Sequence, residues 1–193
     1  MKKSVLLLSL LSLGVSAMGF PGLSTPTNAL IAAKNHGAQQ DSMNNLRQIF
    51  TGITMYTAAN DDMLPVDFSA LASYVGGGRI FVAAFDKKSN PASGNEIKPA
   101  NTSFAYVGNL GRIDALKNAA ATPVAFEKPW LLPPSQRNVM VLFADGHVER
   151  IQLPASAPKT CRGVMTLLNK KIADKNLKNK LNKNAAAEDK AKK

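Results

Sequence analysis

The residue types that usually perform acid–base or nucleophilic chemistry are few in this chain. Only two histidines occur, His36 and His147, and no Gly-x-Ser-x-Gly sequence marks a nucleophilic serine. The triplet at 76–78, Gly-Gly-Gly, lacks the Lys-Ser/Thr that completes a phosphate-binding loop and more simply ends a helix. We therefore expect a protein that is not an enzyme and has no small-molecule substrate. A small hydrolase is the alternative that no residue favours.

Oxygen ligands for a metal gather in two places, the Asn-Asp-Asp run at 60–62 and Asp145. Calcium takes about six to eight oxygen ligands, and these carboxylates do not fall at the spacing of an EF-hand loop. They more simply end a helix and make a turn. The single cysteine, Cys161, excludes an intramolecular disulfide and a cysteine-based zinc site. It is either a semi-buried thiol or a cross-link between two chains. We expect no metal and no cofactor.

The clearest local pattern is at 139–151, where an apolar run meets Asp145-Gly146 and a mixed segment follows. Asp-Gly between two strand-like runs predicts a two-residue type I′ turn, with positive φ at both residues. The first strand is apolar on both faces and should be central, while the second carries charges and should lie nearer an edge. The expected pairs are Ala144 with His147, Phe143 with Val148, and Leu142 with Glu149.

Residues 143–149 resemble the end of prepilin-like proteins that carry a His-x9-Asp-Gly motif, a group abundant in planctomycetes and verrucomicrobia. The further segments that are similar to this family are 44–49, 102–106 and 122–129. The resemblance spans roughly residues 30–153. It implies a pilin-like fold and an envelope protein linked to type II secretion or type IV pilus-like systems. Two positions depart from the family pattern, because Ser135 replaces the motif histidine and no Cys-Pro occurs near residues 83–84.

The first 17 residues have the order of a secretory signal peptide. Lys2 and Lys3 precede a leucine-rich run, and small residues at 15 and 17 predict cleavage between Ala17 and Met18. An uncleaved anchor is the alternative, although the run is short for a membrane span. We expect a mature, exported protein that is periplasmic or secreted and begins at Met18. A prepilin-type start before the hydrophobic run is absent.

An α+β domain is expected over residues 18–158, with a long helix packed on a small antiparallel sheet. Thr25-Pro26 is typical of a helix start, and no breaker follows until residue 60. We expect solid packing from about Gln40, where large apolar residues begin to recur every three to four positions. Asp67 should cap a short helix at 68–75. The predicted strands besides the hairpin are 79–85, 103–107 and 122–126.

Positive charge is concentrated in a tail at 159–193, which holds 11 Lys or Arg and three Asp or Glu, a net +8 of the total +11. Apolar spacing predicts a basic amphipathic helix to about residue 182, free or loosely docked. The last eleven residues contain only Asn, Ala, Lys, Asp and Glu, and they are predicted to be disordered. The lysines expected to contact an anionic polymer or membrane surface are Lys170, Lys171, Lys175, Lys178, Lys180 and Lys183.

Two functions remain. The leading hypothesis is an exported, non-enzymatic, pseudopilin-like envelope protein with protein partners in the cell envelope. The alternative is a protein that binds a polyanion or a membrane surface through the Lys-rich tail.

Overall fold

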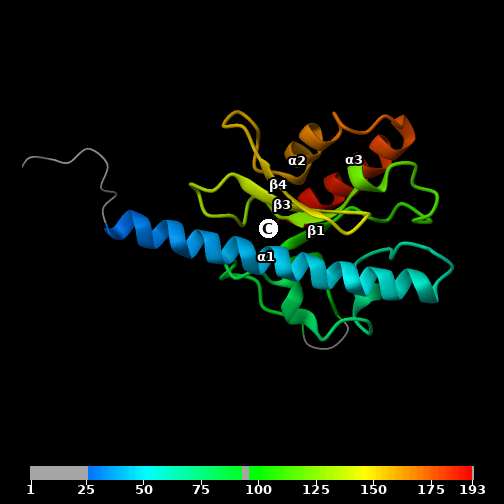
Figure 1. The fold of residues 1–193 in the computed structure, drawn as a ribbon, viewed down its shortest axis with the longest axis horizontal. Coiled ribbons are helices and arrows are strands. Elements are labelled where there is room, and N and C mark those ends of the chain that lie inside the picture. The colour runs from blue at the N-terminus through cyan, green and yellow to red at the C-terminus, as the bar shows by residue number, and fades with distance from the viewer. Residues whose placement is uncertain (1–25, 93–95, 193) are drawn as a thin grey trace, which may run out of the picture.

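The computed structural model describes residues 26–92 and 96–192 (Figure 1), and side chains are described from residue 29 onward. The expected signal peptide and its cleavage residues, Ala17 and Met18, lie outside the described residues. Within the described ranges, no helix combines the length and the apolar character that crossing a membrane requires.

Helix α1 covers Pro26–Ala59, a length of 34 residues. Its first buried residue among those described is Ser42, close to the expected onset of packing. Leu46, Ile49 and Ile53 lie on one side of the helix and are fully buried, because residues three to four apart share a helix face. Asp61 and Asp62 follow with φ of 50° and 58°, a left-handed conformation that ends the helix as expected.

Four antiparallel strands form one sheet in the order β1-β2-β3-β4. Strand β3 is central and buried from its second residue onward, whereas β4 is an edge strand, as its charges predicted. The α+β class with one long helix and a small antiparallel sheet is therefore confirmed. The strands are β1 (Phe104–Tyr106), β2 (Pro123–Glu127), β3 (Asn138–Phe143) and β4 (Val148–Gln152).

The segment between α1 and β1 contains short 3-10 helices. Asp67 caps the first of them, Phe68–Leu71, by accepting hydrogen bonds from two backbone N–H groups, as expected for a helix N-cap. The strand predicted at 79–85 is wrong, because Gly78–Phe81 forms a second 3-10 helix. A strand would place Arg79 and Phe81 on the same face. Here Phe81 is fully buried and Arg79 is exposed.

The hairpin between β3 and β4 reverses through a longer loop than expected. Leu142 pairs with Val148 and not with Glu149, so the register differs by one residue from the prediction. The backbone N–H of Phe143 donates to the carbonyl of His147 at 3.0 Å and closes a loop of three residues. The predicted two-residue turn is therefore wrong, although the position of the reversal is correct.

Only one residue of this loop has positive φ. Gly146 has φ of 92°, whereas Asp145 is not in the left-handed region. The Asp145 carboxylate accepts a hydrogen bond from the His147 backbone N–H at 3.1 Å, which stabilises a turn that needs one glycine instead of two left-handed residues. A Cβ at Gly146 would also collide with the ring of Phe50 on α1.

The tail folds onto the sheet as two helices, α2 (Cys161–Leu168) and α3 (Lys175–Lys190). In Figure 1 the strands lie between α1 and this helix pair. One continuous helix to about residue 182 with a disordered end was expected, and both parts of that expectation are wrong. The expected free arm is also wrong, because the apolar residues of the tail are buried against the body. These residues are Val164, Met165, Leu168, Ile172 and Leu181.

Candidate functional site

Polar residues of α3 close the open edge of strand β1. Glu188 accepts a hydrogen bond from the Tyr106 backbone N–H at 3.1 Å, and the Asn184 amide donates to the Val107 carbonyl at 2.9 Å. These two side chains bind backbone groups that a neighbouring strand would otherwise bind. Residues that composition assigned to a disordered end therefore complete the sheet.

The same helix end also holds α2 in place. The Asp189 carboxylate accepts hydrogen bonds from the backbone N–H groups of Cys161 and Arg162, at 2.7 and 3.1 Å. Those N–H groups stand at the start of α2, where no carbonyl of the same helix can reach them. A carboxylate at a helix N-terminus is also favoured by the helix dipole. The last turn of α3 thus positions α2.

A buried cation completes this contact between the tail and the body. The ammonium group of Lys128 lies 3.6 Å from the Glu188 carboxylate and donates to the Thr102 carbonyl at 3.0 Å. Burial lowers the pKa of Lys128, and the attraction of Glu188 opposes that effect. Burial likewise raises the pKa of Glu188 although Lys128 stabilises its charged form. We define Lys128, Asn184, Glu188 and Asp189 as the tail latch.

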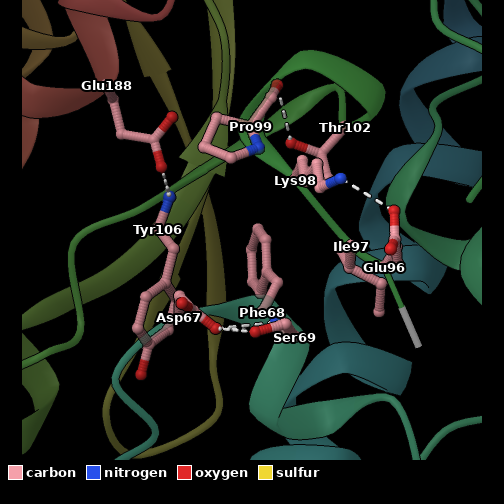
Figure 2. A pocket seen from close by; sticks show the side chains of 10 residues that line it. All are labelled: Asp67, Phe68, Ser69, Glu96, Ile97, Lys98, Pro99, Thr102, Tyr106 and Glu188. Carbon is pink, nitrogen blue, oxygen red and sulfur yellow. Dashed lines mark hydrogen bonds and ion pairs between the residues drawn. The ribbon is translucent and has the colours of Figure 1, made fainter.

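A cavity of about 370 Å³ opens beside the latch (Figure 2). Figure 2 shows Glu188 bound to Tyr106 on one side and Asp67 bound to Ser69 on the other. Glu96 is paired with Lys98 at 2.7 Å at the outer rim. The carboxylates that line this cavity are therefore already engaged in structural contacts. The Ser69 hydroxyl also donates to the Asp67 carboxylate, which at the same time caps the 3-10 helix by accepting from backbone N–H groups. Among the described lining residues, no histidine or lysine base stands beside this hydroxyl.

The lysines expected to bind anions lie on the surface of the docked tail. Lys178 is half-buried and the other five side chains are exposed. Within the described residues, one of the six forms an ion pair, since Lys171 lies 3.4 Å from Glu149. Docking therefore leaves these charges accessible and fixes their positions on a folded surface. The five exposed lysines are Lys170, Lys171, Lys175, Lys180 and Lys183.

Two of these lysines, Lys171 and Lys180, meet cations of the body in a second cavity, of about 310 Å³. Arg112 and Lys117 come from the loop between β1 and β2 and line the same cavity, which we call the basic pocket. Sequence reasoning missed both residues, because the body carries almost no net charge and nothing local indicates which loop the tail covers.

The two histidines are not brought into a catalytic arrangement by the described structure. His36 is exposed on α1, while the His147 ring stacks on Phe143 with centroids 4.3 Å apart. The Nδ1 atom of His147 lies 2.6 Å from the Asp145 carboxylate. Burial raises the pKa of Asp145, but hydrogen bonds from His147 outweigh it and hold the pKa below its usual value. The Asp145–His147 contact thus stabilises the turn.

Neither the cysteine nor the carboxylates form a metal centre in the part of the chain that the structure describes. Cys161 is fully buried, and burial raises the pKa of its thiol well above the usual value. Such a thiol is a poor nucleophile and a poor ligand. The expected alternative of a cross-link between chains would require this buried side chain to become accessible.

One carboxyl group is buried in the core between the sheet and α1. Glu127 at the end of β2 is fully buried and accepts a hydrogen bond from the Met140 backbone N–H at 2.8 Å. Its second oxygen and the hydroxyl of Ser42 on α1 have no hydrogen-bond partner within the described structure. Burial raises the pKa of Glu127 to about 7, and the polar groups beside it, the Met140 N–H and the nearby Ser42 hydroxyl, offset only part of that effect.

The first part of α1 extends beyond the sheet (Figure 1). We call residues 29–41 the projecting half. None of its side chains is buried, and those of residues 29–34 are all exposed. Leu30 is 71% exposed and Ile31 is 53% exposed, the clearest apolar surface on this helix half. Ser135, at the position of the motif histidine, lies exposed in the turn before β3.

Comparisons with family models, with curated proteins and with solved structures find no match to this chain.

Proposed function

We propose that the chain is an exported, non-enzymatic envelope protein of pseudopilin-like type, which binds other envelope proteins of a type II secretion or type IV pilus-like system. The projecting half of α1 is the observation that carries this proposal. Its leucine and isoleucine side chains are exposed on a stretch of helix, residues 29–34, in which every side chain is exposed.

A protein partner suits this surface for a physical reason. Unpacked helix of this length is only marginally stable in water, and most helix stability in proteins comes from packing an apolar face. Leu30 and Ile31 would lose their contact with water in a helix–helix interface, and each fully buried side chain contributes about 1.5–3 kcal/mol. The alanines at 29, 32 and 33 would allow a close approach.

The test is cross-linking in intact cells, followed by identification of the envelope proteins joined to this chain. The variant Leu30→Gln with Ile31→Gln should lose the cross-linked species. Met55→Gln is the matched control, because Met55 is 52% exposed on the packed half of the same helix. Equal cross-linking by the variant, or none by the unaltered protein, would refute the proposal. N-terminal sequencing tests export separately, since an intact Met1 contradicts the expected start at Met18.

A second candidate function is polyanion binding by the tail lysines. It is favoured by five exposed lysines, three on α3 and two in the turn between α2 and α3, in a tail that is held in place. A membrane surface fits less well, because Met165, Leu168 and Ile172, which would insert into lipid, are at most 5% exposed. Retention on heparin that falls steeply with salt would support polyanion binding. Retention that survives neutralisation of Lys170, Lys175 and Lys183 would exclude it.

A further inference from the structure

The basic pocket differs from an ordinary charged surface because it combines cations with an apolar interior. Arg112, Lys117, Lys171 and Lys180 line it together with one carboxylate, that of Asp174. Asp174 caps α3 and accepts a hydrogen bond from the Leu177 backbone N–H at 3.0 Å, so its charge serves the helix. The apolar part of the lining consists chiefly of Leu110, Leu116, Ile172 and Leu177.

Two of the four cations form no ion pair within the described residues. Arg112 binds Asp114 at 2.7 Å and Asp62 at 3.3 Å, and Lys171 lies near Glu149. These pairs are exposed and neutralise part of the charge. Lys117 and Lys180 take part in no ion pair within the described residues, and both line the same cavity from different segments of the chain. The pKa of Asp174 is held below its usual value mainly by the hydrogen bond from the Leu177 backbone N–H, with a smaller contribution from the charge of Lys117. Two ammonium groups against one carboxylate that is bound to its own helix leave a site for negative charge.

The apolar lining decides which kind of anion fits. Leu110 and Ile172 are at most 7% exposed and form solid walls, while Leu116 and Leu177 are half-buried at the opening. Inorganic phosphate or sulfate would leave this surface unused. Burying an apolar ligand group against it contributes about 25 cal/mol per Å², and the volume of about 310 Å³ is at the lower end for small-molecule pockets.

We propose that the basic pocket binds a small amphiphilic anion, with its acidic head group at Lys117 and Lys180 and its hydrocarbon part against Leu116 and Leu177. Asp174 already caps the start of α3 at the same cavity, so the attraction for the head group comes from the two lysines. A medium-chain carboxylate has this chemistry and size. The inference rests on the second candidate function, because Lys171 and Lys180 of the basic pocket are among the tail lysines that it uses to bind anions.

The test is calorimetric titration of the full chain with octanoate, below the concentration at which octanoate forms micelles. Octanol and octylammonium have the same hydrocarbon part without the negative charge, and sulfate has the charge without the hydrocarbon. Octanoate should bind more tightly than all three. Lys117→Gln and Lys180→Gln should each weaken binding about three- to tenfold, and Leu116→Asn should weaken it as well.

Lys175→Gln is the matched control, because Lys175 is exposed on the same helix but does not line the basic pocket. It should leave the octanoate affinity unchanged. Circular dichroism establishes that each variant is folded, which is expected because Lys117, Lys175 and Lys180 are exposed. If Lys117→Gln fails to fold, Lys180→Gln, which lines the same pocket from α3, carries the same test.

Three results would overturn the proposal. They are no octanoate binding, equal binding of octylammonium, and octanoate binding that is unaffected by the Lys117 and Lys180 variants. The outcome is separable from that of polyanion binding. Heparin retention depends on the spread of lysines over the tail surface and should persist in Leu116→Asn, whereas octanoate binding should weaken in that variant.

Discussion

Replacing Glu127 with glutamine should make the protein more stable at neutral pH. In the folded protein this carboxyl group has a pKa of about 7, raised by burial from an ordinary value of 4.5. In the unfolded chain it ionises near 4.5. Between these values the unfolded state binds fewer protons than the folded state, so the free energy of unfolding falls as the pH rises. The difference of about 2.5 pKa units corresponds to about 3 kcal/mol.

Glutamine has the same shape as glutamic acid and remains neutral at every pH. Its carbonyl oxygen can still accept the hydrogen bond from the Met140 backbone N–H. Its amide can donate to the Ser42 hydroxyl, which has no partner in the described structure. Glu127→Gln should therefore match the unaltered protein within about 1 kcal/mol near pH 4 and exceed it by up to about 3 kcal/mol near pH 8.

Urea unfolding followed by circular dichroism, repeated from about pH 4 to pH 8, measures this difference. Comparing the variant with the unaltered protein at each pH removes the contributions of other titrating groups, including Glu188. Glu96→Gln is the control, because Glu96 is exposed and should show a small difference that varies little with pH. A stability difference for Glu127→Gln that does not grow between pH 4 and pH 8 would refute the burial argument.

Three further outcomes follow from the hairpin, the tail and the cysteine. Gly146→Ala should lower the free energy of unfolding by more than about 1 kcal/mol, because it adds backbone strain to a collision with Phe50. Thermal unfolding measures this cost, which should shrink in a Phe50→Ala background; unchanged melting would contradict the turn. A chain ending at Pro158 should melt several degrees lower or fail to fold, since it loses the tail latch and exposes the edge of β1. A chain ending at Lys190 keeps Glu188 and Asp189 and should melt normally, and equal melting of both truncations would show that the tail is not docked. Cys161 should react with a thiol reagent in denaturant and not in the folded protein, because it is fully buried. Rapid labelling without denaturant would show that the contact between α2 and α3 opens readily.

The sequence by itself determined the features that depend on residues close together in the chain. The periodic apolar residues of α1 required a buried helix face, and the doubly apolar β3 required a central strand. Gly146 could be assigned positive φ because no other residue type adopts that conformation as readily. The predicted turn type was wrong, since Asp-Gly serves both a two-residue turn and a longer loop with one left-handed glycine.

Only the tertiary structure decided what the tail does. Local composition at 183–193 offers no large apolar residue, so nothing in it predicts docking. The segment is ordered through Lys190 because Asn184, Glu188 and Asp189 find backbone partners on β1 and α2, at sequence separations of 77, 82 and 28 residues. Periodicity describes neighbours along the chain. It cannot show that a glutamate will meet an unpaired strand edge, or that Lys117 and Lys180 will face one cavity, because those contacts exist only after the sheet and helices have packed.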